Sequence, residues 1–238
     1  DECSHGTHVA AIAAGSTGVA KAASIIAIQV FSKDGRDVGA YDSDILKGLN
    51  RVYALRNRHA IASVNVSIGG DEEFESTCDS SSRAYTSMIN KLYKARIATV
   101  VSSGNEGFSE GLTAPACHSK AISVGSTTKS NKINSWSNGA SYLSLLAPGA
   151  SIRAAVPGGG TEVMSGTSMA APHVTGAWAI LVHRAPAMTV AAGLAALRNT
   201  GLAVRDSRNG LTFRRIRINN ALSRLTPQNR DGSLSPRD

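Results

Sequence analysis

Charged and aromatic side chains are scarce in this sequence of 238 residues, at 18% and 5% of the chain. Apolar residues make up 42%, so the composition excludes a disordered polar chain and provides enough apolar surface for a core. No apolar run approaches the roughly 18 residues that a membrane-spanning helix needs. A basic start followed by an apolar block is also missing, so we expect an intracellular protein or a chain that begins after processing or truncation.

Cysteine is equally scarce, with three residues and no Cys-x-x-Cys spacing, which argues against a zinc ribbon. Cys78 and Cys117 both lie in loop-like surroundings. A disulfide between them would stabilise the fold and indicate an oxidising compartment. Three unrelated thiols, Cys3 included, are the alternative.

Acidic residues are outnumbered, which gives a formal net charge of +8. Nine arginines follow position 197: Arg198, Arg205, Arg208, Arg214, Arg215, Arg217, Arg224, Arg230 and Arg237. A nucleic-acid surface would explain such an excess. The arginines are scattered, however, and no aromatic platform for base stacking accompanies them. A basic solvated face is the simpler interpretation, and we expect no nucleic-acid partner.

Apolar runs and helical periodicities alternate along the chain. Strands are predicted at 24–31, 61–68, 97–103, 121–127 and 144–149, a Pro-Gly-Gly-Gly hairpin at 151–166, and helices at 5–14, 41–57, 84–95, 168–184 and 189–200. This order predicts an α/β fold, with a mostly parallel central sheet covered by helices on both faces. We expect one domain over residues 1–225 and a polar, frayed tail at 226–238.

Candidate catalytic residues lie where strands end and helices begin. In "SGTSMAAPH" (165–173), a Gly-Thr-Ser turn places Ser168 at a helix N-terminus, with Pro172 in the first turn, although most serines there are plain caps. His5 precedes another helix and can act as a general base. Asn105 follows a strand in "SSGNEG" and can donate to an oxyanion together with the Ser168 backbone N–H.

Four segments in this order, "SHGTHVA", "SIGG", "SSGNEG" and "SGTSMAAPHV", resemble the subtilisin-like serine proteases, or subtilases, with the proteinase K and thermitase branches nearest. The resemblance implies a secreted serine endopeptidase that works through an acyl-enzyme. It makes His5 the base, Ser168 the nucleophile and Asn105 the side-chain donor of the oxyanion hole.

The resemblance also implies how substrate is held. The substrate-binding residues are Ser67, Ile68, Gly69, Gly70, Gly104 and Tyr41. The first three form an extended segment that pairs with the substrate backbone, the glycines leave the primary pocket open, and Tyr41 edges a more distant pocket. Substrates are polypeptides, and an inhibitory propeptide and a monomeric state fit the family.

Metal and cofactor roles find little support. A metal at His5 and His8 would need a third ligand, and no carboxylate lies nearby at helical spacing. The resemblance instead implies a packing role for His8. No cofactor is required. A structural calcium ion lacks support, because Ser144 stands where relatives often carry an acidic residue before Ala-Pro-Gly (147–149).

The sequence departs from the family at one catalytic position. Subtilases carry an aspartate in an Asp-Thr/Ser-Gly motif upstream of the His motif, and no such motif occurs here. The candidate aspartates of this chain fall in loop and helix positions that match no catalytic role: Asp34, Asp37, Asp42 and Asp44. We therefore expect a subtilase domain without its first strands. A fragment that is inactive and only binds peptides is the alternative.

Overall fold

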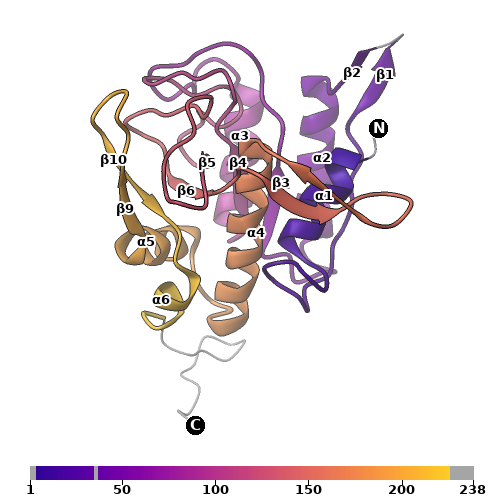
Figure 1. The fold of residues 1–238 in the computed structure, drawn as a ribbon. Helices are drawn as coiled ribbons and strands as arrows, with labels where there is room; N and C mark the ends of the chain where they lie inside the picture. Colours follow the sequence, from indigo (N-terminus) through magenta and orange to yellow (C-terminus); the bar gives the residue numbers. More distant parts are fainter. Residues whose placement is uncertain (1–3, 35–36, 226–238) are drawn as a thin grey trace.

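The computed structural model describes residues 4–34 and 37–225. Its centre is a six-stranded sheet (Figure 1). The strands follow one another in the order β3 (Ser63–Val66), β4 (Ala98–Ser102), β5 (Ile122–Thr127), β6 (Leu145–Pro148), β10 (Thr212–Arg215) and β9 (Leu202–Arg205). All neighbours are parallel except β10 and β9. The mostly parallel sheet predicted from the sequence is therefore confirmed.

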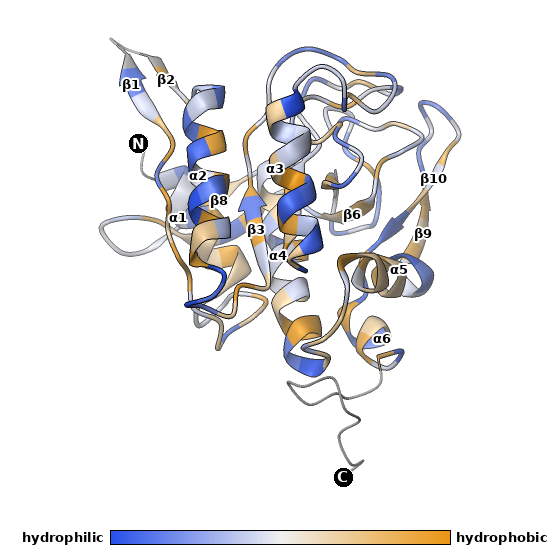
Figure 2. Ribbon diagram, turned by 180° about the vertical axis from the view of Figure 1, so that it is seen from behind, coloured by the Kyte–Doolittle hydropathy of each residue, from blue (hydrophilic) through white to orange (hydrophobic). Residues whose placement is uncertain are grey.

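Helices cover both faces of the sheet, which is why β4 and β5 are buried along their whole lengths. On one face lie α2 (Asp42–Leu55) and α3 (Arg83–Lys94), whose apolar residues at helical spacing form one core with the sheet (Figure 2). On the other face lie α4 (Thr167–Arg184), α5 (Val190–Thr200) and α6 (Ile218–Leu222), where the indole of Trp178 is fully buried.

A smaller layer is formed by α1 (Ser4–Ala13) and the hairpin of β7 (Ile152–Ala155) and β8 (Thr161–Met164). Helix α1 approaches α4 closely at Gly176, where an added Cβ would lie 2.6 Å from the Ala13 carbonyl oxygen. The buried His8 imidazole fixes α1 to the hairpin, since its Nε2 lies 3.1 Å from the carbonyl oxygens of Ile152 and Glu162. These contacts set the position of His5 relative to α4.

The predicted strand at 24–31 is wrong. The segment is irregular, and Ile25 and Ile26 are 49% and 44% exposed. A strand needs a backbone partner, and within 4–34 and 37–225 none pairs with this segment. Its C-terminal half instead packs on α2 through Ile28 and Val30, which would contact a Cβ at Gly48. The sequence also did not predict the short hairpin of β1 (Ser32–Asp34) and β2 (Asp37–Gly39) or the pair β9–β10.

Cys78 and Cys117 form a disulfide, with their Cα atoms 5.3 Å apart. The bridge joins the segment before α3 to the segment before β5, where Cys78 N–H also donates to the Cys117 carbonyl at 3.1 Å. Cys3 and the predicted tail at 226–238 lie outside the described residues. In the part of the chain that is described, no helix combines the length and apolarity needed to cross a bilayer.

Candidate active site

Ser168 is the second residue of α4, which begins at Thr167 after Gly166. The positive end of the helix dipole therefore lies beside its hydroxyl, as the Gly-Thr-Ser turn predicted. The Ser168 hydroxyl donates to the carbonyl oxygen of Ser67 at 3.4 Å, a long bond that leaves the oxygen available to other partners.

Pro172 lies inside α4 and not in its first turn, so that expectation is wrong. The position has a consequence for the nucleophile. Proline has no N–H, so the carbonyl four residues earlier, that of Ser168, has no helical donor. The Ser67 hydroxyl donates to this carbonyl at 2.8 Å. The two serines thus bond to each other in both directions and fasten the start of α4 to the end of β3.

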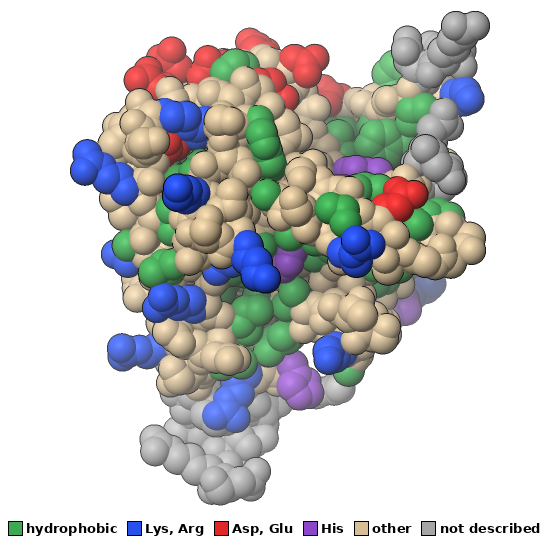
Figure 3. Space-filling view, viewed as in Figure 1, with side chains coloured by type: hydrophobic (Ala, Val, Ile, Leu, Met, Phe, Trp, Pro, Cys, Tyr) green, Lys and Arg blue, Asp and Glu red, His purple; other side chains and the backbone are tan. Residues whose placement is uncertain are grey.

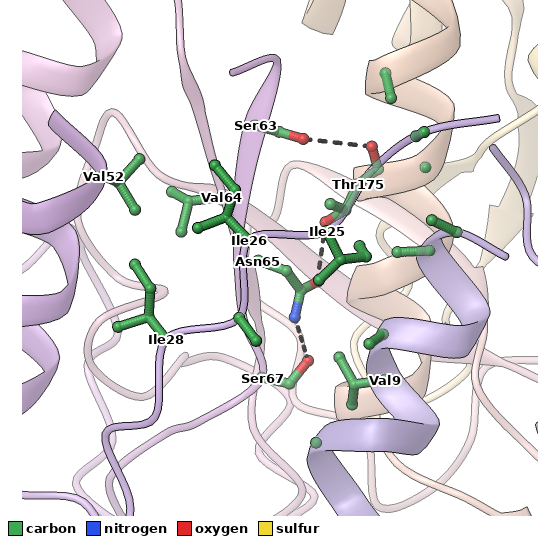
Figure 4. A pocket seen from close by; sticks show the side chains of 18 of the residues that line it. Val9, Ile25, Ile26, Ile28, Val52, Ser63, Val64, Asn65, Ser67 and Thr175 are labelled. Carbon is green, nitrogen blue, oxygen red and sulfur yellow. Dashed lines mark hydrogen bonds between the residues drawn. The ribbon is translucent and has the colours of Figure 1, made fainter. Parts of the chain in front are cut away.

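A short series of polar side chains orients Ser67 (Figure 4). The Thr175 hydroxyl donates to Asn65 Oδ1 at 2.9 Å, and Asn65 Nδ2 donates to the Ser67 hydroxyl at 2.8 Å. Because each hydroxyl has one proton, this order commits the Ser67 proton to the Ser168 carbonyl. This series of hydrogen bonds explains why polar residues occur here among side chains that are mostly apolar.

Asn105 lies in the loop after β4 and is held by Thr167. Its Oδ1 accepts from the Thr167 backbone N–H at 2.9 Å and from the Thr167 hydroxyl at 3.0 Å. Two donors on one oxygen assign the amide orientation and turn the NH₂ group away from Thr167. The Asn105 side chain is thus an oriented amide bonded to Thr167, the residue that precedes Ser168.

His5 lies in the first turn of α1, and its ring meets that of Phe31 edge-on with centroids 6.4 Å apart. Burial, and secondarily the neighbouring His8, lower the pKa of the His5 imidazole below its ordinary value, so the ring is neutral at pH 7 and can accept a proton. No hydrogen bond joins His5 to Ser168 among the described contacts, although both line the same groove. Catalytic hydrogen bonds are often long before substrate binds.

Within the described residues, no Asp or Glu pairs with His5. Two of the candidate aspartates bond to other residues. Asp42 accepts from the Tyr85 hydroxyl at 2.9 Å, and Asp44 pairs with Lys47 at 2.8 Å. The side chains of Asp34 and Asp37 lie outside the described set.

A groove of about 2210 Å³ runs from His5 and Ser168 along the sheet edge. One wall is the irregular segment 24–31, and the other consists of α1 and α4, with β3 between them (Figure 4). Its lining is mostly apolar, with Val9, Ile25, Ile26, Val52 and Val64. Since β3 is an edge strand, an extended segment in this groove could pair with it.

The groove brings together most of the predicted site. His5, Ser168, Asn105, Ser67, Ile68, Gly69 and Gly104 all line it. Gly70 and Tyr41 do not. The Gly70 N–H donates to the Ala114 carbonyl at 3.0 Å, and Tyr41 is 58% exposed just before α2.

Both glycines that the sequence assigned to the primary pocket have steric reasons to be glycine. Gly104 has a φ of +107°, and an added Cβ would collide with the Asn138 amide. A Cβ at Gly69 would lie 2.8 Å from the Thr113 hydroxyl. The backbone beside the site is therefore closely packed on its far side.

The sequence did not predict the contacts of several buried or bonded side chains. His118 is buried, with Nδ1 3.1 Å from the Thr86 hydroxyl and 3.6 Å from Asp79. Thr167 and Arg208 organise the loop of Asn105, and no local sequence motif marks either. Across the described residues, no group of three or more His, Cys, Asp or Glu side chains is arranged to hold a metal ion.

Basic side chains are spread over the face seen in Figure 3, whereas most acidic ones gather along its upper edge. Several C-terminal arginines make bonds within the protein. Arg198 donates to the Ser144 and Leu143 carbonyls, Arg214 to the Gly201 carbonyl and Arg215 to the Thr127 hydroxyl. Internal bonding accounts for part of the arginine excess without a nucleic-acid partner.

Comparison with known proteins gives consistent results. The model of the "Subtilase family" of peptidases matches residues 1–232. "Subtilisin-like protease 3" of Trichophyton tonsurans is 36% identical over 219 residues, covering 90% of this chain and 52% of that protein. A "Subtilisin-like serine protease" of Penicillium rubens, Pen ch 13.0101, is 38% identical over 182 residues, covering 75% and 43%.

The fold has a solved counterpart, described as a cold adapted subtilisin-like serine proteinase. Its structure superposes with a TM-score of 0.77 at 31% identity, covering 89% of this chain and 74% of that one. The chain spans about half the length of the curated relatives it matches.

Proposed function

Since this chain belongs to the subtilase family, we propose that it is a serine endopeptidase that hydrolyses polypeptides through an acyl-enzyme. The observation that carries the proposal is the arrangement at the start of α4. There Ser168 sits in the helix N-terminus, and Thr167 holds the Asn105 amide so that its NH₂ is free to donate. Uncommitted donors beside a nucleophilic hydroxyl suit a reaction that develops an oxyanion.

In the proposed reaction, the Ser168 oxygen attacks the carbonyl carbon of the scissile bond while its proton passes to His5. The carbonyl π-electron pair moves to the oxygen, which the Ser168 N–H and Asn105 Nδ2 stabilise. When the C–N bond breaks, His5 returns the proton to the leaving amine and an ester to Ser168 remains. A water molecule then repeats the sequence, with His5 as base, and releases the acid.

Full activity requires a carboxylate beside His5, because an acceptor for its other N–H fixes the tautomer and stabilises the imidazolium. The groove offers a place for the segment that brings it. A strand paired parallel to β3 would end near Ser67, at the same end of the groove as His5 and Ser168. We infer that the active enzyme has an extended apolar segment in this groove, with an aspartate at that end.

Substrate would bind as an extended chain along Ser67–Gly69, which follows β3 and lines the groove end. The disulfide is typical of secreted proteins, so we place the enzyme outside the cell. An inhibitory propeptide and a monomeric state remain predictions from the family.

A fluorophosphonate probe tests the nucleophile. Once a segment with the carboxylate completes the domain, we expect the probe to label Ser168 and Ser168→Ala to abolish labelling. The exposed-site control Ser130→Ala should label like the parent protein. Labelling at another serine would refute the assignment. A protein that binds an extended peptide but is not labelled would support the alternative of an inactive peptide-binding domain, which is favoured by the lack of a carboxylate beside His5 among the described side chains.

A further inference from the structure

Arg208, in the turn between β9 and β10, joins three parts of the chain that are distant in sequence. Its guanidinium donates to both carboxylate oxygens of Asp206, at 2.7–3.2 Å. Nη1 donates to the Gly107 carbonyl at 3.2 Å and to the Ser135 carbonyl at 2.9 Å. These five bonds need the planar, branched donor set that arginine has and lysine lacks.

The Asp206 carboxylate fixes the guanidinium in place. Asp206 is 2% exposed, whereas the Arg208 side chain is 21% exposed. Burial acts to raise the pKa of Asp206, but the hydrogen bonds and charge of Arg208 outweigh it and hold that pKa below its ordinary value. The pair is therefore ionised at neutral pH, with a rigid carboxylate behind the guanidinium.

The loop that Arg208 contacts carries Asn105. Gly104 and Gly107, on either side of Asn105, have positive φ values of +107° and +81°, a backbone conformation that favours glycine. Asn138 braces one side of the loop, since its Oδ1 accepts from the N–H groups of Glu106 and Phe108 at 3.1 and 3.0 Å. Arg208 braces the other side through the Gly107 carbonyl.

The same clamp includes the neighbours of these residues. Asn209 Nδ2 donates to the Ser109 carbonyl, and Gly107 N–H donates to the Trp136 carbonyl at 2.9 Å. The turn 206–209 and the segment 135–138 thus hold residues 104–109 between them. Neither contacts the groove that contains Ser168.

We propose that Arg208 is a positioning residue for the oxyanion hole, an inference that rests on the proposed function. By fixing the Gly107 carbonyl it holds the backbone of the loop, so that the Asn105 amide stays in the orientation that Thr167 gives it. Without the guanidinium, the loop keeps its contacts with Asn138, Trp136 and Asn209 but loses the bond at the Gly107 carbonyl. Asn105 then samples orientations in which its NH₂ no longer meets the developing oxyanion.

Hydrogen exchange tests the clamp without any need for activity. In Arg208→Ala, we expect the amides of residues 106–108 to exchange at least about tenfold faster, while those of β5 stay unchanged. Arg208→Lys should resemble Arg208→Ala, because lysine cannot reach both carbonyls while bound to Asp206. The matched control is Arg205→Ala, which removes the same charge from an exposed position in β9. Unchanged exchange at 106–108 in Arg208→Ala would overturn the inference.

Probe kinetics test the positioning role. For a fluorophosphonate, Arg208→Ala should lower the maximal inactivation rate by about tenfold to a hundredfold and leave the apparent binding constant unchanged. Added guanidinium ion should restore part of the rate. A rate equal to that of Arg205→Ala, or a fall that tracks only the loss of folded protein, would overturn the positioning role. Failure of the parent protein to react even when completed with the carboxylate-bearing segment would instead count against the proposed function, and the exchange result would still decide the clamp.

Discussion

The Asn105 amide performs two separate tasks that substitution can distinguish. Its Oδ1 accepts from the Thr167 N–H and hydroxyl, and its NH₂ is the proposed oxyanion donor. Asn105→Ala removes both. Asn105→Asp retains an acceptor for Thr167 but replaces the donor with a second carboxylate oxygen. The two variants should therefore differ in stability and agree in losing catalysis.

The magnitudes follow from these contacts. Asn105→Ala leaves the Thr167 N–H, on a fully buried residue, without its acceptor, which costs about 1–3 kcal/mol of unfolding free energy. The Thr167 hydroxyl keeps its bond to the Gly104 carbonyl at 3.3 Å, so the backbone N–H of Thr167 alone is left without a partner. For catalysis, loss of one oxyanion donor lowers kcat by about 10²–10³, a magnitude carried over from subtilisin, a member of the same family.

Two assays read these effects. Urea denaturation should show Asn105→Ala destabilised and Asn105→Asp close to the parent protein. Kinetics on a peptide anilide by the active enzyme should show kcat reduced in both, with KM little changed. A change confined to KM would mean that Asn105 binds substrate and does not stabilise the oxyanion. An Asn105→Asp enzyme with normal kcat would refute the donor role altogether.

Three further predictions concern stability. Reduction of the Cys78–Cys117 bridge should lower the unfolding free energy by about 3–4 kcal/mol, and peptide mapping without reductant should recover these two cysteines as one linked pair; a bridge to any other cysteine would contradict this. Burial lowers the pKa of His118 despite the opposing charge of Asp79, so the unfolded chain takes up the proton first and stability should decline as pH falls below about 6.5. That decline should be smaller in His118→Gln, and an equal decline in both proteins would assign it to other groups. Gly176→Ala should lower the unfolding free energy by about 1–3 kcal/mol, because the added Cβ meets the Ala13 carbonyl. An unchanged thermal unfolding temperature would show that α1 can move away freely.

Local patterns predicted much of this molecule. The spacing of Ile45, Leu49 and Val52 on α2 predicted a helix face that is indeed buried. The Gly-Thr-Ser turn predicted that Ser168 begins a helix. The buried face of α2 and the start of α4 are both determined by residues close together in the chain, and a sequence pattern records such residues.

Features that depend on distant partners were not predicted. Segment 24–31 has strand composition, but a strand forms only against another backbone, and the space beside β3 is an open groove. The Arg208 clamp joins positions about 100 residues apart, so the residues next to Arg208 in the sequence do not reveal it. The pairing of Ser67 with Ser168 likewise follows from a missing N–H at Pro172, whose effect is visible only once β3 lies beside α4.

The central claim is that Ser168 and His5 form a protease site that needs a carboxylate delivered through the groove. We expect residues 1–238 alone to be prone to aggregation, because Ile25, Ile26 and the edge of β3 are exposed. A subtilase segment with the family's Asp-Thr/Ser-Gly motif, joined before residue 1 or added as a peptide, should correct this by covering them. An otherwise identical segment with Asp→Asn is the matched control.

The most direct measurement is kcat/KM for a peptide anilide with the chain alone, with the Asp segment and with the Asn segment. The account predicts that the chain alone is slower by about 10⁴ or more, that the Asp segment restores both solubility and turnover, and that the Asn segment restores solubility only. Hydrolysis at ordinary protease rates by the 238 residues alone would contradict it, since a carboxylate within this chain would then be serving His5.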